Sequence, residues 1–79
     1  MRSLLLKHGI CGKCYFVKQL NLQEDVERRF AVLGVTTGVK IQILNKKKSG
    51  AMVIKVRGTR FAIGAEFAEG IVVGDETDE

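Results

Sequence analysis

The chain of 79 residues has no proline or tryptophan, one histidine and two cysteines. With a single histidine and no acid pair at a suitable spacing, it offers neither a Ser-His-Asp set nor paired carboxylates for acid–base chemistry. Its glycines form no phosphate-binding loop and no dinucleotide fingerprint after a strand. We therefore expect that the protein is not an enzyme.

Long apolar runs are also missing. No run approaches the roughly 18 residues that a bilayer-spanning helix needs, and the three leucines before Lys7 are too few for a signal peptide. We expect no membrane insertion and a cytoplasmic location, where the cysteines stay reduced unless they bind metal or do redox work. The length suits one domain, which we place at residues 1–74.

Charge is unevenly distributed along the chain. Four of the nine acidic residues lie in residues 75–79, which we expect to form a disordered acidic tail. The remaining 74 residues carry thirteen basic and five acidic side chains, a difference of about +8. A basic body suits nucleic acid, an anionic membrane surface or an acidic protein partner, and charge alone does not choose among them.

The most regular segment is a helix followed by a glycine turn and a strand. Asn21 is placed to cap the helix, with Glu24 in the capping-box position. An apolar stripe then recurs at helical spacing, at Leu22, Val26, Phe30 and Leu33. Gly34 is the expected helix stop and Gly38 closes a second turn. The alternation that follows in residues 39–44 predicts a strand with one buried face.

Short strands account for most of the remaining chain. We expect them at residues 14–20, 39–44, 51–57, 60–63 and 71–73, with a tight turn at Gly58-Thr59 and a helical turn within residues 64–70. This pattern predicts a mainly β fold: a small barrel of about five strands, with one helix inserted after the first strand and a short helical turn near the C-terminus. An OB-like barrel is the alternative to an SH3-like one.

Three segments resemble the FeoA family of bacterial ferrous iron transport. They read RRFAVLGVTTGVKIQIL from Arg28, MVIKVRGTRFAI from Met52 and EFAEGIVV from Glu66. The resemblance implies an SH3-like barrel and an accessory role in ferrous iron uptake. It also implies that the protein binds the FeoB transporter and modulates its activity through the transporter's GTP-binding domain. Binding to the transporter would place the protein peripherally at the inner membrane. Thr37 departs from the family, which often has proline there.

The resemblance directs attention to the helix and its C-terminal turn as a partner contact. Arg28 and Arg29 complement the helix dipole and are also placed to meet a partner near Leu33 and Gly34. Leu22 opens the helix and is assigned first to the core and second to the contact. These five residues are the candidate partner-binding set.

Three potential metal ligands recur at three-residue steps, His8, Cys11 and Cys14. Gly9 and Gly12 would let the backbone turn so that the three converge on zinc or ferrous iron. Zinc sites generally use four ligands, so a fourth would have to come from elsewhere. The plainer interpretation is two small cysteines at a turn beside an exposed histidine. A metal-binding or metal-sensing module remains an alternative function, and a transition metal ion, zinc or ferrous iron, is the one cofactor that the sequence suggests.

Basic residues in the second half of the chain suggest a further alternative. If they share one face they would form a phosphate-binding patch: Lys46, Lys47, Lys48, Lys55, Arg57 and Arg60. Solvated loop and strand positions explain them equally well, and aromatic residues for base stacking are few. A nucleic-acid-binding barrel is therefore kept as an alternative function. In the favoured interpretation the protein has no nucleic acid partner. Exposed sheet edges would also allow a homo-oligomer.

Overall fold

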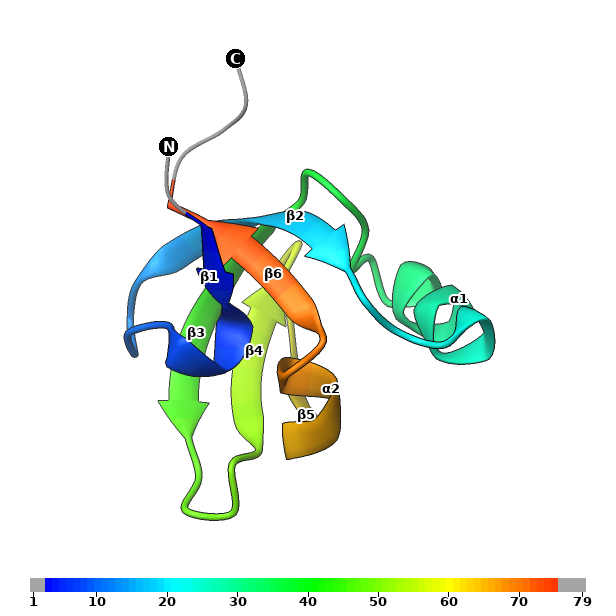
Figure 1. Ribbon diagram of the computed structural model, residues 1–79. Coiled ribbons are helices and arrows are strands. Elements are labelled where there is room, and N and C mark those ends of the chain that lie inside the picture. Colours follow the sequence, from blue (N-terminus) through cyan, green and yellow to red (C-terminus); the bar gives the residue numbers. More distant parts are fainter. Residues whose placement is uncertain (1–2, 76–79) are drawn as a thin grey trace.

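The computed structural model describes residues 3–75, which form one antiparallel sheet with two α-helices and a 3-10 turn (Figure 1). In chain order the elements are β1 (Ser3–Leu5), η1 (Leu6–His8), β2 (Cys14–Leu20), α1 (Glu24–Val32), β3 (Lys40–Lys46), β4 (Met52–Val56), β5 (Thr59–Ile63), α2 (Ala65–Ala68) and β6 (Ile71–Gly74). The predicted mainly β fold, with a helix after β2 and a short helix near the C-terminus, is confirmed.

The sheet has the strand order β1-β6-β2-β3-β4-β5, so the first and last strands of the chain lie side by side. Leu4 pairs with Val73 across β1 and β6. The described residues therefore contain six strands, whereas the sequence predicted about five. The additional strand is β1, which is only three residues long and is defined by its pairing with β6 rather than by any periodicity of its own.

The core residues of the sheet follow the period-2 pattern of the strands. Ile41, Ile43, Ile54 and Val56 have no exposed surface. In β2, where both faces carry apolar residues, Tyr15 points inward because it pairs with the buried Ile41. Its neighbours Cys14 and Phe16 consequently lie on the outer face and are half-buried.

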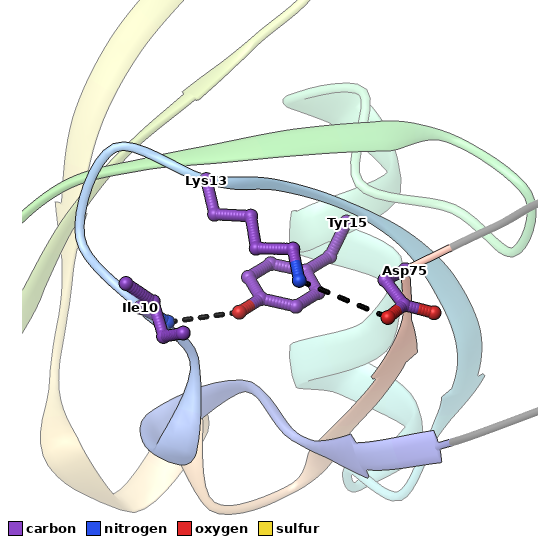
Figure 2. A network of polar contacts seen from close by, with 4 residues as sticks. All are labelled: Ile10, Lys13, Tyr15 and Asp75. Atoms are coloured by element: carbon purple, nitrogen blue, oxygen red, sulfur yellow. Dashed lines mark hydrogen bonds and ion pairs between the residues drawn. The ribbon is translucent and has the colours of Figure 1, made fainter.

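Tyr15 also fixes the turn that leads into β2 (Figure 2). Its hydroxyl accepts a hydrogen bond of 2.9 Å from the backbone N–H of Ile10. The Lys13 ammonium lies 5.4 Å from the ring centroid and 3.7 Å from a carboxylate oxygen of Asp75. The first residue of the predicted acidic tail thus contacts the folded domain, and its other four positions, 76–79, lie outside the described residues.

Helix α1 begins later than the sequence suggested. Its N-cap is Gln23, with no side-chain cap. The predicted Asn21 cap is wrong, because the Asn21 side-chain oxygen accepts a 2.8 Å hydrogen bond from Gln19 Nε2 instead. The predicted stop at Gly34 is correct. Its φ is 97°, and the N–H groups of Gly34 and Val35 donate to the carbonyls of Ala31 and Phe30, which is a Schellman motif.

The β4–β5 hairpin turns one residue earlier than predicted. Val56 pairs with Thr59, so the two turn residues are Arg57 and Gly58 rather than Gly58 and Thr59. Both have positive φ, 54° at Arg57 and 83° at Gly58. This is the type I′ geometry that matches the twist of two-residue hairpins, although an arginine at the first position is unusual.

Candidate docking surface

Helix α1 projects to one side of the sheet and is joined to α2 by an aromatic contact (Figure 1). Phe30 is the buried residue of α1. Its ring meets Phe67 edge to face, with the centroids 5.6 Å apart and the planes at 64°. Such pairs contribute about 0.5–1.5 kcal/mol beyond their area burial. This ring contact therefore anchors the helix, together with Val26, which also packs against the core.

A shallow groove runs between α1 and α2. It has a volume of about 290 Å³ and is lined by Asn21, Leu22, Gln23, Val26, Glu66 and Phe67. Leu22 and Val26 are half-buried against the core, which agrees with the dual assignment of Leu22 to core and contact. The groove has an apolar floor and a polar rim, a composition that suits insertion of an apolar side chain from a partner.

The solvent-facing side of α1 carries two stripes of charged residues, each ending in an exposed apolar residue. Glu24, Arg28 and Val32 follow one another at four-residue steps, and Asp25, Arg29 and Leu33 form the neighbouring stripe. Val32 is 85% exposed and Leu33 is 45% exposed. We call Arg28, Arg29, Val32 and Leu33 the outer face of α1.

Both arginines of the outer face form weak ion pairs within the helix. Arg28 lies 3.9 Å from Glu24 and Arg29 lies 3.8 Å from Asp25, and all four side chains are largely exposed. Exposed pairs of this kind are worth about 0.3–0.5 kcal/mol, so a partner carboxylate can displace them at little cost. The arginines are therefore available for docking.

The structure brings most of the predicted contact residues together. Arg28, Arg29 and Leu33 lie on the outer face, Gly34 shapes the turn that ends it, and Leu22 lies in the groove near the start of the helix. Sequence reasoning missed Val32, the most exposed large apolar residue of the described chain. The available signal was that Val32 falls off the apolar stripe, four residues after Arg28.

The potential metal ligands lie in three successive segments of the chain. His8 ends η1 and is exposed, Cys11 is an exposed free thiol and Cys14 begins β2. Across residues 3–75, no three histidine, cysteine, aspartate or glutamate side chains are grouped so that they could hold a metal ion. The structure thus does not gather His8, Cys11 and Cys14 into a three-ligand site. It also has no helix, within the described residues, that is long and apolar enough to cross a membrane.

These features define a class of protein: a small SH3-like β domain with a projecting helix that exposes Val32 and Leu33 at its C-terminal end. A family model for the FeoA domain matches residues 4–74, and the chain belongs to that family. No curated protein sequence matches it significantly.

Solved structures of FeoA proteins share this fold. A crystal structure of an iron uptake regulatory protein (FeoA) is 27% identical, with a TM-score of 0.84, and the match covers 92% of this chain and 97% of that one. The solution structure of a FeoA protein from Chlorobium tepidum is 26% identical, with a TM-score of 0.85, over 96% of this chain and 74% of that one.

A third structural relative has a different description. A manganese-dependent transcriptional repressor has a TM-score of 0.86 and covers 94% of this chain at 17% identity. The match covers only 42% of the repressor, so this chain corresponds to less than half of that protein. At this identity the likeness shows the fold alone.

Proposed function

We propose that this chain is a non-catalytic accessory protein of ferrous iron uptake. It binds a FeoB-type transporter at the cytoplasmic face of the membrane and modulates the activity of that transporter. The expected contact is the transporter's GTP-binding domain. Membership of the FeoA family and the likeness to an iron uptake regulatory protein support the process. Neither identifies the partner, so the binding partner is the part that needs a direct test.

The observation that carries the proposal is the exposure of Val32 and Leu33 on a helix that also presents two arginines. Val32 in the last turn and Leu33 at the C-cap stabilise neither the helix nor the core where they are exposed to water. A partner that covers them would bury apolar surface worth roughly 25 cal/mol per Å². The neighbouring arginines would supply orientation, since arginine is favoured at protein interfaces.

The test is ferrous iron uptake in cells that lack this gene and carry either the wild-type gene or a variant. Val32→Lys places a charge on the outer face and remains compatible with the dipole at the helix C-terminus. We expect uptake to fall to the level of the deletion strain.

The matched control is Ile10→Lys. Ile10 is 63% exposed, precedes β2 and lies at the opposite end of that strand from α1. This variant should restore normal uptake. Normal uptake with both variants would show that the outer face of α1 does not carry the activity, and loss of uptake with both would point to the general change in charge.

A further inference from the structure

A second surface, separate from α1, is strongly basic. Lys40 on β3, Lys55 on β4, Arg57 in the β4–β5 turn and Arg60 on β5 are all exposed. We call these four residues the basic sheet face. Three of them come from strands that are neighbours in the sheet, so their charges accumulate on one surface.

The other basic residues that the sequence grouped with them lie elsewhere. Lys46 is at the opposite end of β3 from Lys40, and its ammonium donates a 2.8 Å hydrogen bond to the carbonyl of Gly9. Lys47 and Lys48 follow it into the β3–β4 loop, which extends away from the β4–β5 turn (Figure 1). The sequence cluster therefore divides into a loop part and a sheet part.

The sheet part places like charges directly against one another. Lys55 and Arg60 are cross-strand partners. Ile41 pairs with Val56, so Lys40 and Arg57 each lie next to the same end of the β3–β4 ladder. Directly opposed like charges destabilise a sheet. This opposition, with Lys40 and Arg57 close to it, leaves an excess of positive charge on one face that a bound anion would offset.

No counter-charge within residues 3–75 relieves this arrangement. Within residues 3–75, Lys7, Lys13, Arg28 and Arg29 each have an acidic partner, whereas no ion pair involves the four residues of the basic sheet face. Three of the four, Lys40, Lys55 and Arg57, line a groove of about 400 Å³, together with Cys14, Val39, Gln42 and Gly58. The lining contains three cationic side chains and no acid.

Arg57 adds a second, independent observation. It is the only non-glycine residue of the described chain with positive φ, a conformation that costs an L-residue free energy and that Asn or Gly would adopt more easily. Its side chain lies against the α1–β3 turn, since a Cβ at Gly34 would be 3.2 Å from Arg57 Cδ. Backbone strain that is held in place by packing is typical of functional positions.

We propose that the basic sheet face binds an extended, carboxylate-rich peptide segment of a partner protein. The groove is lined from β2, β3 and β4, which spans about 10 Å at the usual strand spacing and suits a single extended chain. Val39 contributes an apolar side chain to its lining. Its lining has no aromatic ring, whereas surfaces that bind single-stranded nucleic acid use aromatic stacking.

The test measures fluorescence anisotropy of two labelled probes, a peptide of alternating glutamate and serine and a single-stranded RNA oligonucleotide of equal charge. The full-length protein should bind the peptide more tightly than the RNA, and more weakly as salt rises. Lys55→Gln combined with Arg60→Gln should weaken peptide binding about tenfold. The same variant should melt no lower than the wild type, because it removes a like-charge opposition.

The matched control is Lys47→Gln combined with Lys48→Gln, which removes the same charge from the loop. It should change peptide affinity by less than about twofold. Equal weakening by the two double variants would overturn the proposal in favour of net charge alone. Tighter binding of RNA than of peptide would overturn it in favour of a nucleic-acid surface, and absence of peptide binding at low salt would overturn it outright. None of these results depends on α1, so they leave the proposed function unaffected.

Discussion

The rings of Phe30 and Phe67 meet edge to face with their centroids 5.6 Å apart, which ties the projecting helix α1 to the short helix α2. Phe67 also lines the groove between the two helices. The same contact therefore holds the helix in position and forms part of the candidate docking surface. A change at this contact should affect the order of α1 before it affects the sheet.

Phe30→Leu tests this arrangement. The variant keeps an apolar side chain but loses the ring contact, so we expect the free energy of unfolding to fall by about 1 kcal/mol. Amide hydrogen exchange should accelerate in α1 and remain slow in β3 and β4. Val32→Ala is the control, because Val32 is 85% exposed and surface changes stay within about 0.5 kcal/mol. Unchanged exchange in α1 would show that other contacts hold the helix.

Tyr15→Phe isolates one hydrogen bond. It removes the hydroxyl that accepts from the Ile10 N–H and keeps the ring, which is 2% exposed. We expect a loss of about 1 kcal/mol in the free energy of unfolding and faster exchange of the Ile10 amide. Urea denaturation and hydrogen exchange measure the two effects. An unchanged Ile10 exchange rate would mean that this bond does not hold the turn before β2.

Arg57→Asn should stabilise the protein, because Asn adopts positive φ more readily than arginine and favours the type I′ turn. We expect the free energy of unfolding to rise by about 0.5–1 kcal/mol. Gly58→Ala in the same turn should lower it by about 1 kcal/mol, since φ is 83° there. Thermal denaturation of both variants measures the pair. A stabilising Gly58→Ala, or a destabilising Arg57→Asn, would contradict the assigned turn.

Metal content tests the alternative built on His8, Cys11 and Cys14. Because no three-ligand group exists in residues 3–75, we expect the purified protein to hold much less than one zinc or iron ion per chain after dialysis. Elemental analysis of the wild type and of a Cys11→Ser, Cys14→Ser variant should give the same low value. One metal per wild-type chain, lost in the double variant, would establish the cysteine site.

Much of the fold was predictable because local signals agreed with tertiary packing. Gly34 stops α1 as expected, and the alternation of Ile41 and Ile43 identifies the buried face of β3. β1 was missed because three residues have no measurable period and depend on β6. The buried face of β2 could not be predicted because both faces carry apolar residues. The pairing of Tyr15 with the buried Ile41 decides it.

The candidate surfaces were predictable only in part. Leu22, Arg28, Arg29 and Leu33 were identified through the family resemblance, but the exposure of Val32 depends on how Phe30 seats the helix against Phe67. The basic residues were noticed as a group, yet their division between loop and sheet follows from the direction of β3. Lys40 was assigned to the sheet part only from the structure, in which it lines the same groove as Lys55 and Arg57.

The central claim is that the outer face of α1 binds the iron transporter. The most direct measurement is co-purification of the tagged protein from its own cells in mild detergent, at low and moderate salt, for the wild type, Val32→Lys and Ile10→Lys. The account predicts recovery of the transporter at both salts with the wild type and Ile10→Lys, and its loss with Val32→Lys. Equal recovery with Val32→Lys, or recovery of nucleic acid alone that disappears as salt rises, would contradict it.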